Sequence, residues 1–147
     1  MMSGDFSARQ LARRQKIMIV DDSPVCCEVA SLILRKAGYA VVSVYSPIGF
    51  VNQLRRELPD LVLVDVAMPA MSGPKLVELA KQKKPAKCAI VLYSDRPTDE
   101  LERFVLECGA DGFIPKSADG PALIKAAAKF IAQKARAASL APDPSKG

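Results

Sequence analysis

The sequence contains no histidine, and this absence removes two kinds of chemistry. A phosphohistidine carrier is excluded, and a zinc site loses its usual imidazole ligands. The four cysteines show no metal-ligand spacing and lie within apolar runs. We therefore expect Cys26, Cys27, Cys88 and Cys108 to be buried, reduced thiols of a cytoplasmic protein.

Long apolar runs are also missing. Half of the 147 residues are apolar, but no uninterrupted stretch reaches the roughly 20 residues that span a membrane. The segment from Met1 to Lys16 is basic, and the strand-like stretch from Lys16 to Val20 is too short for the apolar region of a signal peptide. The sequence predicts one domain with a full core and no membrane insertion.

Aromatic residues are absent among the basic clusters, although the net charge is +5. The excess positive charge lies within residues 9–16, 81–87 and 125–136. Without interleaved aromatic rings there is no stacking platform for single strands, and no recognition-helix or zinc-finger pattern is present. We interpret these lysines and arginines as solvated faces and expect no direct contact with nucleic acid.

Strand-like and helix-like segments alternate five times along the chain. The third strand-like segment, Leu61 to Val64, consists of four aliphatic residues, which is typical of a strand buried on both faces. Strict alternation predicts a doubly wound parallel sheet with helices on both faces. The predicted strands span residues 16–20, 39–45, 61–64, 88–93 and 112–115, and the predicted helices about 24–37, 47–58, 74–84, 98–108 and 121–138.

Capping residues mark the ends of the first two predicted helices. Ser23 and Pro24 are expected to open the first, and Gly38 to close it. Ser46 and Pro47 are expected to cap the second. The apolar residues that recur at helical spacing are Val25, Val29, Leu32 and Ile33 in the first helix and Ile48, Val51, Leu54 and Leu58 in the second.

Polar residues follow four of the five predicted strands. Asp21 and Asp22 follow the first strand, Asp65 the third, Ser94 the fourth and Lys116 the fifth. In a parallel sheet of this kind, ligands bind beyond the carboxyl ends of the strands. We therefore expect these side chains to meet at one edge of the sheet and to form a site.

The residue types at this edge indicate phosphoryl chemistry. Carboxylates held close together repel one another, and a divalent cation removes that penalty. Oxygen ligands without histidine or cysteine favour Mg²⁺. A cation, the Lys116 ammonium and the Ser94 hydroxyl around one carboxylate suit a phosphoryl group, with Asp65 as the nucleophile that forms an aspartyl phosphate.

Four segments of the chain together resemble the receiver domain of two-component response regulators. They are IVDDSP at 19–24, LVDVAMPAMSG at 63–73, the serine at 94 and GADGFIPK at 109–116. The resemblance extends from about residue 16 to residue 134. It implies a flavodoxin-like fold, in which a five-stranded sheet of order 2-1-3-4-5 is flanked by five helices.

The resemblance also implies a role for each residue of the site. Asp65 would accept a phosphoryl group from the phosphohistidine of a partner sensor kinase or phosphotransfer protein. Asp22, Asp65 and the Ala67 carbonyl would ligate Mg²⁺, and Asp21 would hold a metal-bound water. Ser94 and Phe113 would form a switch pair, in which the hydroxyl turns to the phosphoryl group and the ring moves inward.

The sequence departs from the family pattern after Ser94 and after Lys116. Asp95 stands where the family usually has Ala or Gly, so it either faces the site and opposes phosphorylation or faces solvent and caps the next helix. We favour the second. Ser117 replaces a proline that commonly follows a cis bond, and we expect either a trans bond or a strained loop.

We divide the chain into a basic N-terminal extension (1–15), a receiver domain (16–138) and a disordered tail (139–147). The residues after the receiver are too few for an output module, so the output is expected to be a protein surface. By resemblance it lies on the helix 98–108, the strand 112–115 and the last helix. It would include Arg103, Glu107, Lys125 and Lys129, although Lys125 and Lys129 are equally well explained as solubilising charges.

Three functions remain open from the sequence. The first is a single-domain regulator of a two-component phosphorelay, switched by phosphorylation, which catalyses only its own phosphoryl transfer and dephosphorylation. The second is a pseudo-receiver that binds partners constitutively, with Asp95 as its main argument. The third is a Mg²⁺-dependent phosphohydrolase with an aspartyl intermediate. Ala67 argues against the third, because it provides no acid or base two residues after Asp65.

Overall fold

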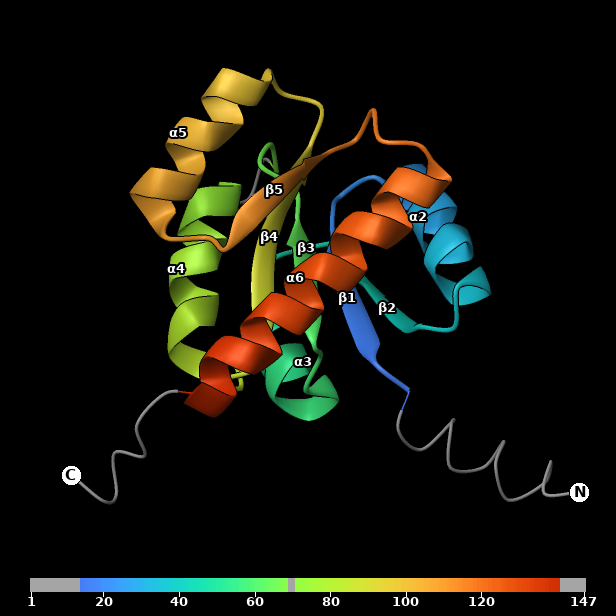
Figure 1. Cartoon of the computed structure of the whole chain (residues 1–147). Coiled ribbons are helices and arrows are strands. Elements are labelled where there is room, and N and C mark those ends of the chain that lie inside the picture. Colours follow the sequence, from blue (N-terminus) through green and yellow to red (C-terminus); the bar gives the residue numbers. More distant parts are fainter. Residues whose placement is uncertain (1–13, 69–70, 141–147) are drawn as a thin grey trace, which may run out of the picture.

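The computed structural model describes residues 14–68 and 71–140, and within them the chain forms a five-stranded parallel sheet with helices on both faces (Figure 1). The strand order is β2-β1-β3-β4-β5, which confirms the predicted fold class. The proposed extension and tail lie largely outside the described residues. The strands are β1 (Lys16–Val20), β2 (Ala40–Val44), β3 (Leu61–Val64), β4 (Ala89–Ser94) and β5 (Gly112–Pro115). The helices are α2 (Pro24–Lys36), α3 (Phe50–Glu57), α4 (Gly73–Lys83), α5 (Thr98–Cys108) and α6 (Gly120–Leu140).

The register of the sheet aligns the carboxyl ends of its strands. Val20 at the end of β1 pairs with Val64 at the end of β3, and Val64 pairs with Leu92 near the end of β4. All four residues of β3 are fully buried, as expected for a central strand covered on both faces. The residues that follow β1, β3 and β4 therefore emerge together at one edge.

Helices α3, α4 and α5 cover one face of the sheet, and α2 and α6 cover the other. In Figure 1, α6 lies across the sheet beside α2. Side chains alternate between the faces, so Met18 and Val20 pack with the first group of helices and Ile17 and Ile19 with the second. The same alternation continues past the strand ends and decides toward which face each polar residue of the site projects.

The capping residues predicted for α2 are found at both of its ends. The apolar stripe that was predicted from helical spacing, however, is largely exposed. Ser23 Oγ accepts the Cys26 amide at 3.3 Å, and Gly38 follows the helix with φ of +103°. The stripe Val25, Val29 and Leu32 is 70%, 54% and 54% exposed. The helix carries apolar residues on two faces, and only one can meet the sheet. The face that does so consists of Cys27, Ala30, Ser31 and Leu34.

The second predicted helix starts later than expected. Ser46 Oγ accepts the Ile48 amide at 3.1 Å, so Ser46 belongs to a turn and not to a helix cap. Gly49, with φ of +82°, precedes α3 instead. Ile48 is consequently 84% exposed, and Leu58 lies beyond the helix end in the left-handed region with φ of +49°.

Three further expectations meet clear outcomes in the second half of the chain. Pro97 precedes α5 and no side chain caps it, so the expected capping by Asp95 is wrong, although Asp95 is exposed as favoured. The described residues contain no cis peptide, so the Lys116–Ser117 bond is trans. The last helix continues to Leu140, two residues into the proposed tail, because no Gly or Pro interrupts residues 122–140.

No helix within residues 14–68 and 71–140 has the length and apolar character needed to cross a membrane.

Candidate phosphoacceptor site

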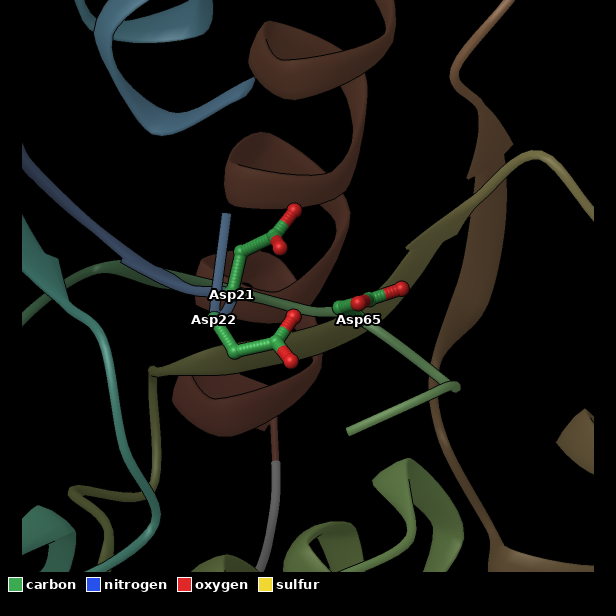
Figure 2. Close-up of side chains that lie close together, drawn as sticks. All are labelled: Asp21, Asp22 and Asp65. Carbon is green, nitrogen blue, oxygen red and sulfur yellow. The ribbon is translucent and has the colours of Figure 1, made fainter. Parts of the chain in front are cut away.

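Three carboxylates gather where the adjacent strands β1 and β3 end. Figure 2 shows Asp21 and Asp22 projecting from the chain after β1 and Asp65 from the chain after β3. One oxygen of each carboxylate lies within 4.8 Å of an oxygen of each of the other two. Asp21 and Asp65 are buried, whereas Asp22 is exposed. The predicted convergence of these three residues is therefore present.

Lys116 joins the cluster from the end of β5 and pairs mainly with Asp21. Its Nζ lies 2.7 Å from Asp21 Oδ2 and 3.7 Å from Asp65 Oδ1. The Ser23 amide donates to the other oxygen, Asp21 Oδ1, at 2.9 Å. Both oxygens of Asp21 are thus engaged. Burial lowers the pKa of Lys116, but the hydrogen bond and charge of Asp21 and the charge of Asp65 outweigh it and raise that pKa, so the lysine is held in its charged form.

The pKa of Asp65 is raised, chiefly by burial and further by the charges of Asp21 and Asp22. The Lys116 charge and a long hydrogen bond of 3.4 Å from the Ala67 amide act in the opposite direction without cancelling the rise. The cluster also contains three carboxylates and only the one ammonium of Lys116 that pairs with them in the part of the chain described. An all-oxygen cluster with excess negative charge fits a hard divalent cation such as Mg²⁺.

Ser94 and Phe113 lie on neighbouring strands and on the same face of the sheet. Phe113 pairs with Leu92, and Leu92 and Ser94 are two residues apart on β4. Ser94 is buried and its Oγ accepts the Arg96 amide at 3.1 Å. Phe113 is partly buried against the core on the side of α3, α4 and α5. This placement puts the two residues of the predicted switch pair on one face of neighbouring strands, while their switching remains a prediction.

Ala67 and Arg96 stand two residues after Asp65 and Ser94, respectively. Ala67 is exposed, and its amide donates to Asp65 Oδ1 at 3.4 Å. The Arg96 guanidinium pairs with Glu100 on the next helical turn at 3.2 Å. Arg96 thus pairs with Glu100 and not with its neighbour Asp95. Asp95 is exposed and lies outside the group of three carboxylates.

Tyr93 is a neighbour of the site that the sequence reasoning missed. The Lys116 ammonium lies 5.8 Å from the centroid of its ring, and burial raises the pKa of the Tyr93 hydroxyl. Strand alternation could have found it, because Tyr93 immediately precedes Ser94 and so projects to the opposite face, where Lys116 lies. Val25, Cys26 and Val29 complete a cavity of about 190 Å³ with these two residues.

The cysteines are all free thiols, as predicted. Cys27, Cys88 and Cys108 are buried, and burial raises the pKa of Cys88 to about 12, which keeps it protonated. Cys26 is only partly buried, which differs from the expectation, because it lies on the rim of the cavity beside Lys116.

The carboxylate cluster and Lys116 thus lie together at the strand ends of a doubly wound α/β domain. The family model of the response regulator receiver domain matches residues 17–128, so the chain belongs to the response regulator receiver domain family.

Curated relatives of this chain are considerably longer proteins. The chain is 30% identical over 127 residues to the protein-glutamate methylesterase/protein-glutamine glutaminase 1 of Anaeromyxobacter dehalogenans, covering 86% of this chain and 36% of that protein. It is 30% identical over 121 residues to response regulator GtcR of Aneurinibacillus migulanus, covering 82% and 48%. The chain therefore spans less than half the length of these relatives.

Solved structures show the same fold. The CheY-like response regulator receiver domain protein from Methanospirillum hungatei superimposes with a TM-score of 0.76 and 24% identity, covering 84% of this chain and 98% of that one. This likeness concerns the fold and assigns no partner or activity.

Proposed function

We propose that Asp65 accepts a phosphoryl group from the phosphohistidine of a partner sensor kinase or phosphotransfer protein. The observation that carries the proposal is the meeting of Asp65 with two further carboxylates and Lys116 at the carboxyl edge of the sheet. In the transfer, an Asp65 carboxylate oxygen bonds to phosphorus while the P–N bond breaks. The imidazole nitrogen of the partner leaves with the electron pair.

Two side chains of the chain would stabilise the transferred charge. Lys116 already lies 3.7 Å from Asp65 Oδ1, so its ammonium can contact a phosphoryl oxygen after a small movement away from Asp21. Ser94 now accepts a hydrogen bond, and its hydroxyl can rotate to donate to the same group. This rotation would leave space beside β4 and β5 for inward movement of the Phe113 ring.

A Mg²⁺ ion would be held by Asp22, Asp65 and the Ala67 carbonyl, with Asp21 acting through a water. Asp22 suits direct ligation because it is exposed, and within the described residues no hydrogen bond or ion pair engages its carboxylate. Asp21 suits an indirect role, since both its oxygens are already engaged. When bound, the cation neutralises clustered carboxylates and charge on the phosphoryl oxygens.

The surface formed by α5, β5 and α6 would change on phosphorylation and be recognised by a partner. Phe113 on β5 is the residue that would connect this surface to the site, because it packs on the face beneath α5. A target protein would bind there. The exposed charged residues assigned to this surface are Arg103, Glu107, Lys125 and Lys129.

The geometry favours this function over its two alternatives. The main argument for a constitutive pseudo-receiver is Asp95, but this residue is exposed and lies outside the cluster of three carboxylates. The phosphohydrolase requires a side chain that positions a water near Asp65, and Ala67 has none. The methylesterase activity named for one longer relative belongs to a protein of which the chain spans 36%.

Intact mass spectrometry after incubation with acetyl phosphate and Mg²⁺ tests the proposal. The wild type should gain the mass of one phosphoryl group, EDTA should prevent the gain, and Asp65→Asn should not gain it. A phosphoryl group that remains on Asp65→Asn would place the acceptor elsewhere and contradict the proposal.

A further inference from the structure

Gly73, the first residue of α4, packs directly against the backbone of Asp65. Its amide donates to the Val66 carbonyl at 3.1 Å, and the residue is buried. A Cβ placed on Gly73 would lie 2.5 Å from the Asp65 carbonyl oxygen and 2.7 Å from Val66 Cα. Both distances are well inside van der Waals contact, so no residue with a side chain fits here without movement.

Both sides of this contact are anchored. The Asp65 amide donates to the Val20 carbonyl of β1 at 2.9 Å, which holds the end of β3 to the sheet. On the other side, α4 is held by Leu76 and Val77, which are buried in the core. A methyl group at Gly73 must therefore push the Asp65–Val66 peptide and the start of α4 apart, by about 0.5 Å or more.

We propose that Gly73 is a positioning residue for the phosphoacceptor, because the absence of its side chain sets where Asp65 lies relative to Lys116 and Asp22. The inference rests on the proposed function of Asp65. The Asp65 side chain is carried by the Cα that precedes this peptide, and the Ala67 carbonyl follows it two peptide units later, so displacement of the peptide alters the position of both. Misplacement of a reacting group by about 1 Å costs roughly 10²-fold in rate, and a smaller shift costs correspondingly less.

The chain offers two matched controls. Gly120 is also the first residue of a helix and is also followed by proline, but a Cβ there would meet Ile33 Cγ2 at an ordinary 3.6 Å. Gly120→Ala therefore repeats the chemical change without the clash. Ser72 caps α4 by accepting the Lys75 amide at 3.3 Å. Ser72→Ala weakens the start of the same helix without adding an atom against Asp65.

The experiment compares the wild type with Gly73→Ala, Gly120→Ala and Ser72→Ala. It measures the phosphorylation rate at saturating acetyl phosphate by intact mass, Mg²⁺ affinity by calorimetric titration, and stability by urea unfolding. Gly73→Ala should phosphorylate about tenfold more slowly or worse and bind Mg²⁺ several-fold more weakly. Gly120→Ala and Ser72→Ala should stay within about twofold of the wild type in both measurements, although Ser72→Ala should unfold at lower urea.

Each contrary result has a distinct meaning. Equal rates and Mg²⁺ affinities for Gly73→Ala and Gly120→Ala would overturn the inference. An equal loss in Ser72→Ala would overturn it as well, because the effect would then follow helix stability and not the contact with Asp65. Failure of Gly73→Ala to fold would show that the contact supports the whole domain, and would also overturn it. A wild type that binds Mg²⁺ but takes no phosphoryl group would contradict the proposed function, and the Mg²⁺ titration would still decide the role of Gly73.

Discussion

Replacing Asp65 with asparagine should stabilise the protein in metal-free buffer at neutral pH. Carboxylate oxygens of Asp21 and Asp22 lie within 4.8 Å of Asp65, so at an effective dielectric constant of about 20 each pair repels by about 3.5 kcal/mol or more. Lys116, at 3.7 Å, attracts Asp65 by about 4.5 kcal/mol on the same scale. The two repulsions exceed the attraction by about 2.5 kcal/mol. Exposure of Asp22 reduces its share of the repulsion, so the expected gain in the free energy of unfolding is about 1–2 kcal/mol.

The pH dependence of this gain has a definite sign. The pKa of Asp65 is raised in the folded state, mainly by burial, so the folded protein binds the proton more tightly than the unfolded chain. This contribution to stability is present in acid, below the unfolded pKa, and is lost as the pH rises through the folded pKa. The advantage of Asp65→Asn should therefore be small in acid and complete at neutral pH.

Urea unfolding in EDTA, at neutral pH and again in mild acid, measures the effect. Glu102→Gln, which removes an exposed carboxylate on α5, is the control and should change stability by less than about 0.5 kcal/mol. Mg²⁺ should stabilise the wild type more than Asp65→Asn, so the difference between their free energies of unfolding should become smaller when the ion is added. A variant less stable than the wild type in EDTA at neutral pH would refute this account of the cluster.

Three other predictions concern separate parts of the site. Asp22→Ala should weaken Mg²⁺ binding several-fold more than Asp21→Ala, because both oxygens of Asp21 are already engaged; equal losses in a calorimetric titration would contradict the ligand assignment. Self-dephosphorylation of the wild type should be slow, since Ala67 cannot orient a water. Ala67→Asn should speed this hydrolysis by up to about 10²-fold, and Arg96→Ala should change its rate less. Phosphate-release time courses on the three proteins measure these rates. Lys116→Met should lower the free energy of unfolding by about 3 kcal/mol or more, because the buried Asp21 carboxylate then lacks the ammonium that pairs with it. An unchanged midpoint in urea unfolding would contradict this prediction.

Much of the site was predictable because the periodicity of strands is local and regular. The four-residue run of β3 and the polar residues after four of the five strands were sufficient to place Asp21, Asp22, Asp65 and Lys116 at one edge. Such reasoning requires only that parallel strands end together. The side chain at each strand end then follows from the alternation of the strand before it.

The helices were less predictable, since helical spacing identifies an apolar face but not which face is buried. The exposed stripe of α2 comes from this ambiguity, whereas Ile48 is exposed because it precedes the start of α3. The α2 helix presents its small residues Cys27 and Ala30 to the sheet, because they allow the helix to pack closely, and hydrophobicity alone does not reveal that choice.

The sequence by itself determined the alternation of strands and helices, the edge at which the acidic and basic side chains gather and the type of cation that they suit. Those properties follow from residue types and short-range periodicity. Only the tertiary structure decided that Lys116 lies nearer to Asp21 than to Asp65, that Arg96 pairs with Glu100, and that Gly73 contacts the Asp65 backbone. Distances between groups on different loops depend on how strands and helices pack as three-dimensional bodies, and no local pattern in the chain encodes them.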